Sequence, residues 1–65
     1  MKLLIYEMRS KKGWSGVVLA KKSGIPQASI YRYEKGEENP TIERLELIAK
    51  ALDVKITDLF ESKYK

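Results

Sequence analysis

The sequence contains neither cysteine nor histidine, and only two prolines. Without cysteine, no disulfide bond and no thiolate metal site can supplement the hydrophobic core, and this composition fits a cytoplasmic protein. Without histidine or cysteine, and with no paired carboxylates placed where a pocket could form, the chain lacks the usual nucleophile, acid-base and metal-ligand sets. We therefore expect no enzyme activity, no cofactor and no metal.

Long apolar runs are also missing. No segment approaches the ~20 residues that a membrane span requires, so we expect no membrane association. A chain of 65 residues forms one domain, residues 1–65, and buries only about 60% of its unfolded surface. Such a domain has no room for a substrate cavity in addition to its core.

Positive charge exceeds negative charge. Lysine and arginine number 13 against 9 acidic residues, which gives a net charge of +4 and a pI near 9.4. This balance suits a polyanionic partner, although a mild excess of positive charge also serves solubility alone. Charge by itself does not decide the function.

Apolar residues recur at helical spacing through most of the chain. Met1, Leu4, Ile5 and Met8 follow the i, i+3, i+4, i+7 spacing of a buried helical stripe, which predicts a first helix within residues 1–12. Gly13 ends it. Trp14, directly after, is a bulky residue that we expect to fill the core.

Four further helices are expected from the same reasoning. Ser15 is a good N-cap for the second helix, Pro26 can start the third, and Thr41 caps the fourth. The inward residues of the third helix are Ile30 and Tyr33. The fourth helix repeats the core spacing with Ile42, Leu45, Ile48, Ala49 and Leu52, and a short fifth helix has Ile56, Leu59 and Phe60. The tail, residues 61–65, is expected to fray. The sequence thus predicts an all-α domain of five short helices.

The stretch 15–34 is the centre of this arrangement and predicts two helices joined by a tight turn. Ala20 is small enough for two helix backbones to cross closely, and Gly24 can adopt the positive φ that a short turn requires. Ile30 fills the angle between the two helices. These features fit a helix-turn-helix whose second helix reads DNA, and they also fit a helical hairpin in a small bundle.

The chain resembles the Cro and phage-repressor (Xre-like) helix-turn-helix family along nearly its whole length. The matching residues are Ile5, Met8, Arg9, Gly13, Ser15, Leu19-Ala20, Ser23-Gly24-Ile25, Gln27, Ser29-Ile30, Glu34, Gly36, Asn39-Pro40-Thr41, Leu45, Ile48-Ala49, Leu52 and Leu59-Phe60. The resemblance implies a compact five-helix, lambda-repressor-like fold that binds operator sites on double-stranded DNA as a two-fold symmetric homodimer. It also implies an ion pair between Arg9 and Glu34 that ties the first helix to the third.

The third helix carries the side chains that we expect to read bases. The amide of Gln27 has paired donor and acceptor groups that match adenine N6 and N7, and Ala28 offers a methyl group to thymine. One turn later, Arg32 can donate two hydrogen bonds to guanine or hold a phosphate. Contacts to the DNA backbone are expected from Ser15, Gly16, Ser29, Tyr31, Lys35 and Asn39.

Two positions depart from the family pattern. Gly16 stands where the family has a glutamine that helps to hold a phosphate. Pro26 stands where the third helix often begins with serine or threonine. Backbone N–H groups at the start of the second helix can still meet a phosphate.

An apolar strip suggests how two copies meet. Its members lie off the core stripe of the fourth helix and in the tail, and they are Leu47, Ala51, Val54, Phe60 and Tyr64. We therefore expect a DNA-binding regulator, a repressor that acts as a homodimer. The alternative is a protein-interaction module of the same fold, antitoxin-like or an adaptor, in which Val17, Val18 and Leu47 would contact another protein.

Overall fold

The structure, a computed structural model, describes all of residues 1–65 and contains four α-helices, one turn of 3-10 helix and a two-stranded sheet. In chain order the elements are β1 (Lys2–Leu3), α1 (Ile5–Lys11), α2 (Gly16–Ser23), α3 (Gln27–Lys35), α4 (Ile42–Leu52), η1 (Ile56–Leu59) and β2 (Phe60–Glu61).

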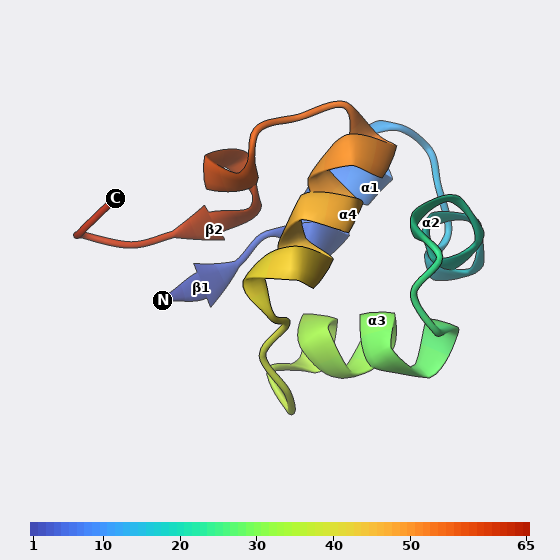
Figure 1. Ribbon diagram of the computed structural model, residues 1–65, viewed down its shortest axis with the longest axis horizontal. Coiled ribbons are helices and arrows are strands. Elements are labelled where there is room, and N and C mark those ends of the chain that lie inside the picture. The colour runs from blue at the N-terminus through green and yellow to red at the C-terminus, as the bar shows by residue number, and fades with distance from the viewer.

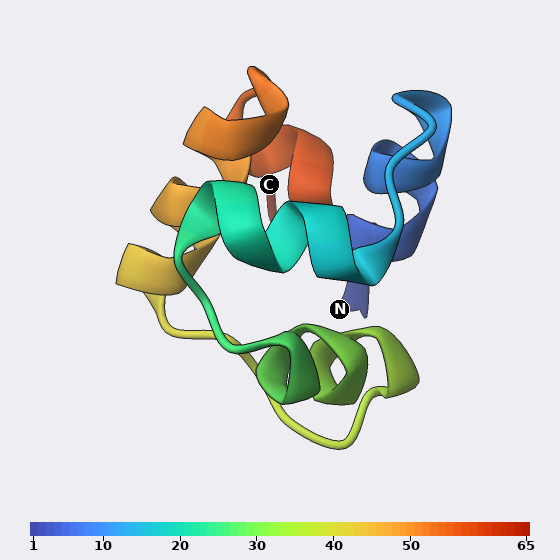
Figure 2. The same cartoon turned by 90° about the vertical axis from the view of Figure 1, so that its right-hand side faces the viewer.

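Helix α2 lies at the centre of the helical packing and contacts the other three α-helices. In Figure 2 it runs across the molecule, with α1 and α4 to either side of it and α3 below. Figure 1 shows α3 as the lowest helix of the molecule and β1 and β2 on the far side of α4 from α2. The helix that the sequence predicts to read DNA therefore lies at one edge of the fold.

The core joins all four helices and η1. Its apolar members are buried and touch one another; they are Ile5, Leu19, Ala20, Ile25, Ile30, Tyr33, Leu45, Ile48, Ala49, Leu52 and Leu59. Trp14 is half-buried and packs against this cluster from outside. Because Ile30 and Tyr33 belong to the core, one face of α3 is fixed while the opposite face stays open.

Local signals in the sequence set the helix ends. The Oγ of Ser15 accepts a hydrogen bond from the Val18 N–H at 3.3 Å, and Thr41 Oγ1 accepts one from the Arg44 N–H at 3.1 Å. These contacts satisfy N–H groups that the first turn of a helix leaves free. Gly24, at φ 75°, ends α2 in the left-handed region, which lets the chain turn directly into α3.

The start of the first helix was predicted wrongly. Helix α1 begins at Ile5, and Met1 is 76% exposed instead of lying on a buried stripe. Residues 2–3 form β1, in which Leu3 pairs with Phe60 antiparallel. The pairing, together with the Leu4 N–H that donates to the Leu59 carbonyl at 2.8 Å, satisfies backbone groups of residues 2–4, and Leu3 packs against the core.

The fifth helix is also corrected. Residues Ile56–Leu59 form a single turn of 3-10 helix, and Phe60 belongs to strand β2. The spacing of Ile56 and Leu59 fits one turn of 3-10 helix as well as it fits an α-helix. The backbone that follows is extended because it pairs with β1. The end of the chain has partners too, because Lys65 Nζ donates to the carbonyl oxygens of Thr57 and Phe60 at 3.0 and 2.9 Å.

Ile42 does not belong to the core stripe of α4. It is the first residue of that helix and is 69% exposed, whereas Leu45 is buried. The core spacing of α4 therefore starts one turn later than predicted, because the neighbouring elements leave the Ile42 side chain uncovered. None of the helices combines the length and apolar character that crossing a bilayer demands.

Candidate nucleic-acid interface

The outer face of α3 is open to solvent. Gln27, Ala28, Arg32 and Lys35 are all exposed, and the helical repeat places them on one side of the helix. Both views show α3 at an edge of the molecule, with no other helix covering its lower side. An exposed helix at an edge has the shape that enters the major groove of DNA.

The inner face of α3 is closed by packing and hydrogen bonds. Tyr33 is 2% exposed, and its hydroxyl accepts a hydrogen bond from Arg44 Nη1 at 2.7 Å. Ser29 lies on this face and is 5% exposed, so its side chain is not presented with Gln27 and Ala28. This near-complete burial does not favour the backbone contact predicted for Ser29. Ser29 lies one turn before Tyr33, so helical spacing alone places it on the same inner face.

Arg32 is held by protein partners. Its Nε donates to Glu38 Oε1 at 3.1 Å, and its Nη2 donates to Ser29 Oγ at 3.4 Å. Both members of the ion pair are about half exposed, with side-chain exposures of 47% and 44%. An exposed pair of this kind contributes about 1 kcal/mol or less, so DNA can compete for the guanidinium.

Three of the predicted backbone contacts meet at the start of α2. Gly16 is buried, and Tyr31 of α3 is half-buried beside it. A Cβ placed on Gly16 would lie 2.7 Å from Tyr31 Cε1 and 2.8 Å from the Tyr31 hydroxyl oxygen. Ser15, the N-cap, precedes Gly16 directly. The tip of the Tyr31 ring thus lies against the first turn of α2, which sequence spacing could not reveal.

The structure brings Arg9 and Glu34 together. Arg9 Nε and Nη2 donate to the two carboxylate oxygens of Glu34 at 2.7 and 3.0 Å, and Nη1 donates to the Trp14 carbonyl at 2.9 Å. The side chains are 10% and 9% exposed. The hydrogen bonds that Arg9 donates to Glu34 raise the pKa of the Arg9 guanidinium above its ordinary value, although burial opposes this. The pair links α1 to the end of α3, and both oxygens of its carboxylate accept a hydrogen bond.

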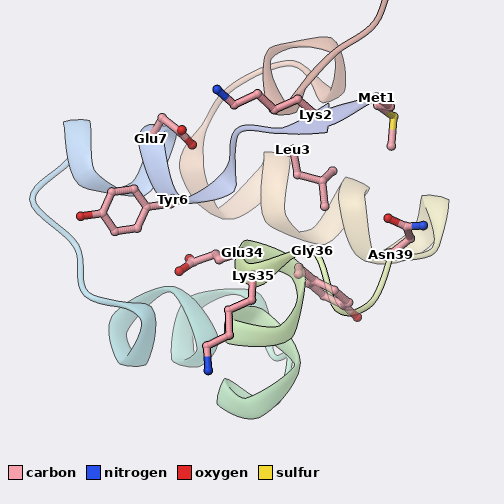
Figure 3. Close-up of a pocket in the computed structure, with 10 residues that line it drawn as sticks. Met1, Lys2, Leu3, Tyr6, Glu7, Glu34, Lys35, Gly36 and Asn39 are labelled. Atoms are coloured by element: carbon pink, nitrogen blue, oxygen red, sulfur yellow. The ribbon is translucent and has the colours of Figure 1, made fainter.

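An open hollow of about 490 Å³ lies between β1, α1 and the end of α3. Figure 3 shows Asn39 at the opposite end of the hollow from Tyr6 and Glu7, and Lys35 pointing away from β1 and α1. Lys35 and Asn39 are both exposed, as backbone contacts require. The Lys35 amine therefore points to the side of the molecule on which α3 is open to solvent.

The predicted apolar strip is divided in the structure. Leu47, 44% exposed, and Ala51 line a shallow depression with Lys22, Ser23 and Lys50. This places them beside the end of α2. Strand β2 with Phe60 and the C-terminal tail with Tyr64 lie on the other side of α4 (Figure 1). Val54 is half-buried and packs against the core.

Comparison with known proteins agrees with this arrangement. A family model described as helix-turn-helix matches residues 5–59, which is most of the chain. The chain belongs to this helix-turn-helix family. The family resemblance seen in the sequence is confirmed, and it makes the chain a DNA-binding regulator and not an enzyme.

Two relatives from Archaeoglobus fulgidus are named uncharacterized HTH-type transcriptional regulators. They are 38% and 35% identical to this chain over 60 residues, which is 92% of this chain and 86% and 84% of theirs.

Two solved structures resemble the fold. The restriction-modification controller protein C.AhdI from Aeromonas hydrophila matches with a TM-score of 0.83 and 32% identity, over 86% of this chain and 85% of that one. The N-terminal DNA-binding domain of SinR from Bacillus subtilis matches with a TM-score of 0.82 and 32% identity, over 94% and 90% of the two chains.

Proposed function

We propose that this chain is a transcriptional repressor that binds a palindromic operator as a homodimer and inserts α3 into the major groove. The observation that carries the proposal is the division of α3 into a buried inner face and an exposed outer face bearing Gln27 and Ala28 at its N-terminal end. In helix-turn-helix proteins the N-terminal residues of the recognition helix contact base edges. A cytoplasmic location is part of this proposal, because the absence of cysteine fits a reducing compartment.

Base contacts are assigned to Gln27, Ala28 and Arg32. Gln27 pairs with adenine and Ala28 packs on a thymine methyl group, while Arg32 leaves Glu38 to bind guanine or a phosphate. Backbone contacts are assigned to the start of α2, at Ser15 and Gly16, and to the group formed by Tyr31, Lys35 and Asn39. Support comes from the exposure of Lys35 and Asn39 and from the position of Tyr31 at the first turn of α2.

The test of DNA binding is a titration of the protein with random-sequence duplex at increasing salt. Phosphate contacts made by lysine and arginine release counterions, so affinity should fall steeply as salt rises. Absence of salt-dependent binding would favour the alternative, a protein-interaction module.

The homodimer is assigned to the outer side of α4 around the exposed Leu47, together with the half-buried Ala51 and, just beyond the end of the helix, the half-buried Val54. Leu47→Glu should convert a dimer into a monomer in sedimentation experiments, because two carboxylates would meet across a two-fold axis. Ile42→Glu is a matched control, since Ile42 is exposed on the same helix but outside this patch. A parent that stays monomeric at high concentration and on DNA would contradict the dimer.

A further inference from the structure

The close approach of Tyr31 to Gly16 carries a consequence for DNA binding. The three atoms nearest to a Cβ on Gly16 are Cε1, Cζ and the hydroxyl oxygen of Tyr31, at 2.7, 2.7 and 2.8 Å. These are the atoms at the tip of the side chain. The contact therefore sets the hydroxyl, and not merely the flat ring, against the first turn of α2.

The backbone conformation at residue 16 does not require glycine. Its φ is not in the left-handed region, unlike those of Gly13, Gly24 and Gly36. It lies in the first turn of a helix, where alanine stabilises the fold better than glycine does. What Gly16 provides is space, and Tyr31 occupies that space.

Free hydrogen-bond donors meet at this point. The N–H groups of Gly16 and Val17 open α2, have no preceding helical carbonyl to bond, and donate to no other backbone oxygen. Gly16 is buried beside Tyr31, whereas Val17 is 38% exposed. Every buried side-chain polar atom in the structure has a hydrogen-bond partner. The Tyr31 hydroxyl has none within the protein, so this hydroxyl is not fully buried and keeps some exposure to solvent at the same turn.

The charge of the interface makes neutral donors important. Helix α3 carries two cations on its outer face, Arg32 and Lys35, and the loop after it carries Glu37 and Glu38. Arg32 is already paired with Glu38. Uncharged donors can therefore add to the contacts that lysine and arginine make with a polyanion at this surface.

We infer that Tyr31 is a DNA-backbone contact whose hydroxyl shares one phosphate with the free Val17 N–H at the start of α2, and that Gly16 is needed because a side chain there displaces the phenol. The inference rests on the proposed DNA-binding function and adds to it a specific coupling between residues 16 and 31. Tyr31 positions the phosphate without contributing to the choice of base.

Tyr31→Phe is the direct test, because it removes the hydroxyl and keeps the ring. Affinity for duplex DNA should fall roughly three- to tenfold per bound protomer. The loss should be equal for selected and random sequences, since a phosphate contact reads no base. The salt slope should stay unchanged, because a neutral hydroxyl displaces no counterion. Tyr6→Phe, at an exposed tyrosine of α1, is the matched control and should bind like the parent.

Gly16→Ala tests the coupling and separates it from damage to the fold. The melting temperature should stay the same or rise, because the tip of Tyr31 can swing away and alanine favours the helix, while DNA affinity falls as in Tyr31→Phe. The double variant Gly16→Ala/Tyr31→Phe should bind no more than about twofold worse than either single variant.

Two results would overturn the inference. A Tyr31→Phe protein that binds DNA as tightly as the parent would remove the hydroxyl from the contact. Losses that multiply in the double variant would remove the coupling. A parent that binds no duplex at all would instead overturn the proposed function together with this inference, so the two failures are distinguishable.

Discussion

The two faces of α3 differ in the burial of their side chains and in the hydrogen-bond and ion-pair partners that these side chains have. On the inner face, Ile30 and Tyr33 are buried, the Tyr33 hydroxyl is hydrogen-bonded, and Glu34 is held by Arg9. On the outer face, Gln27 and Lys35 are exposed and form no ion pair or side-chain hydrogen bond. The inner face therefore fixes the helix in the fold, whereas the outer face leaves the polar groups of Gln27 and Lys35 free for a partner and holds Arg32 by an exposed ion pair. Substitutions on the two faces should separate stability from DNA binding.

The largest expected effect comes from the inner face, at Arg9 and Glu34. Because both side chains are about nine-tenths buried, Arg9→Met or Glu34→Leu leaves a charge without its partner and should cost about 3–5 kcal/mol of unfolding free energy. The double variant should recover part of that loss. Urea denaturation followed by circular dichroism measures all three, and strictly additive losses would mean that the two residues do not interact.

The pH for that experiment follows from the raised pKa of Arg9. A cation whose pKa is raised in the folded state contributes stability that is fully present below its unfolded pKa. This contribution is lost only as the pH rises through the folded pKa. Both values lie far above neutrality, so Arg9 is charged and its full contribution is measured near pH 7.

An intermediate effect is expected at Lys35, on the outer face. Lys35→Ala should leave the unfolding free energy unchanged, because the amine has no partner in the fold. Affinity should fall equally for all DNA sequences, and the salt slope should become shallower by about one unit for each phosphate that Lys35 neutralises. Lys55→Ala is a matched control, because Lys55 is exposed beside η1, away from α3. A changed base preference in the Lys35 variant would contradict a phosphate contact.

The smallest expected effect is a gain, at Glu38. Glu38→Gln removes the carboxylate that pairs with Arg32 and lowers the negative charge next to the DNA. Since an exposed ion pair is worth about 1 kcal/mol or less, affinity should rise by roughly fivefold at most. Glu43→Gln, at an exposed acid on α4, shows what a charge change alone does. Equal gains in both variants would mean that Arg32 is not released by losing its partner.

Much of the helical framework could be predicted because it depends on local signals. Ser15 and Thr41 act as N-caps, Gly24 turns the chain, and the spacing of Leu45, Ile48 and Leu52 marks the core face of α4. These features are set by residues within one or two turns of one another. The pairing of Arg9 with Glu34, which spans 25 positions, was accessible only through the family resemblance.

The remaining features depend on how distant segments meet. Helical spacing cannot show that residues 2–3 pair with residues 60–61, because the same apolar residues fit a short strand or a helix end. The contact of Gly16 with Tyr31 depends on the angle between α2 and α3. The ion pair of Arg32 with Glu38 depends on the course of the loop after α3.

Selection of bound sites from a random DNA pool, with the parent and with Gln27→Ala, tests the central claim most directly. The parent should select a palindrome with half-sites about 10 base pairs apart, because two recognition helices on one face of B-DNA lie one helical turn from each other. Gln27→Ala should lose preference at one symmetric pair of positions, at a cost of about 1–3 kcal/mol there, with an unchanged salt slope and unchanged stability. A folded Gln27→Ala protein that selects the same sites with the same preference at every position would contradict the reading of bases by the outer face of α3.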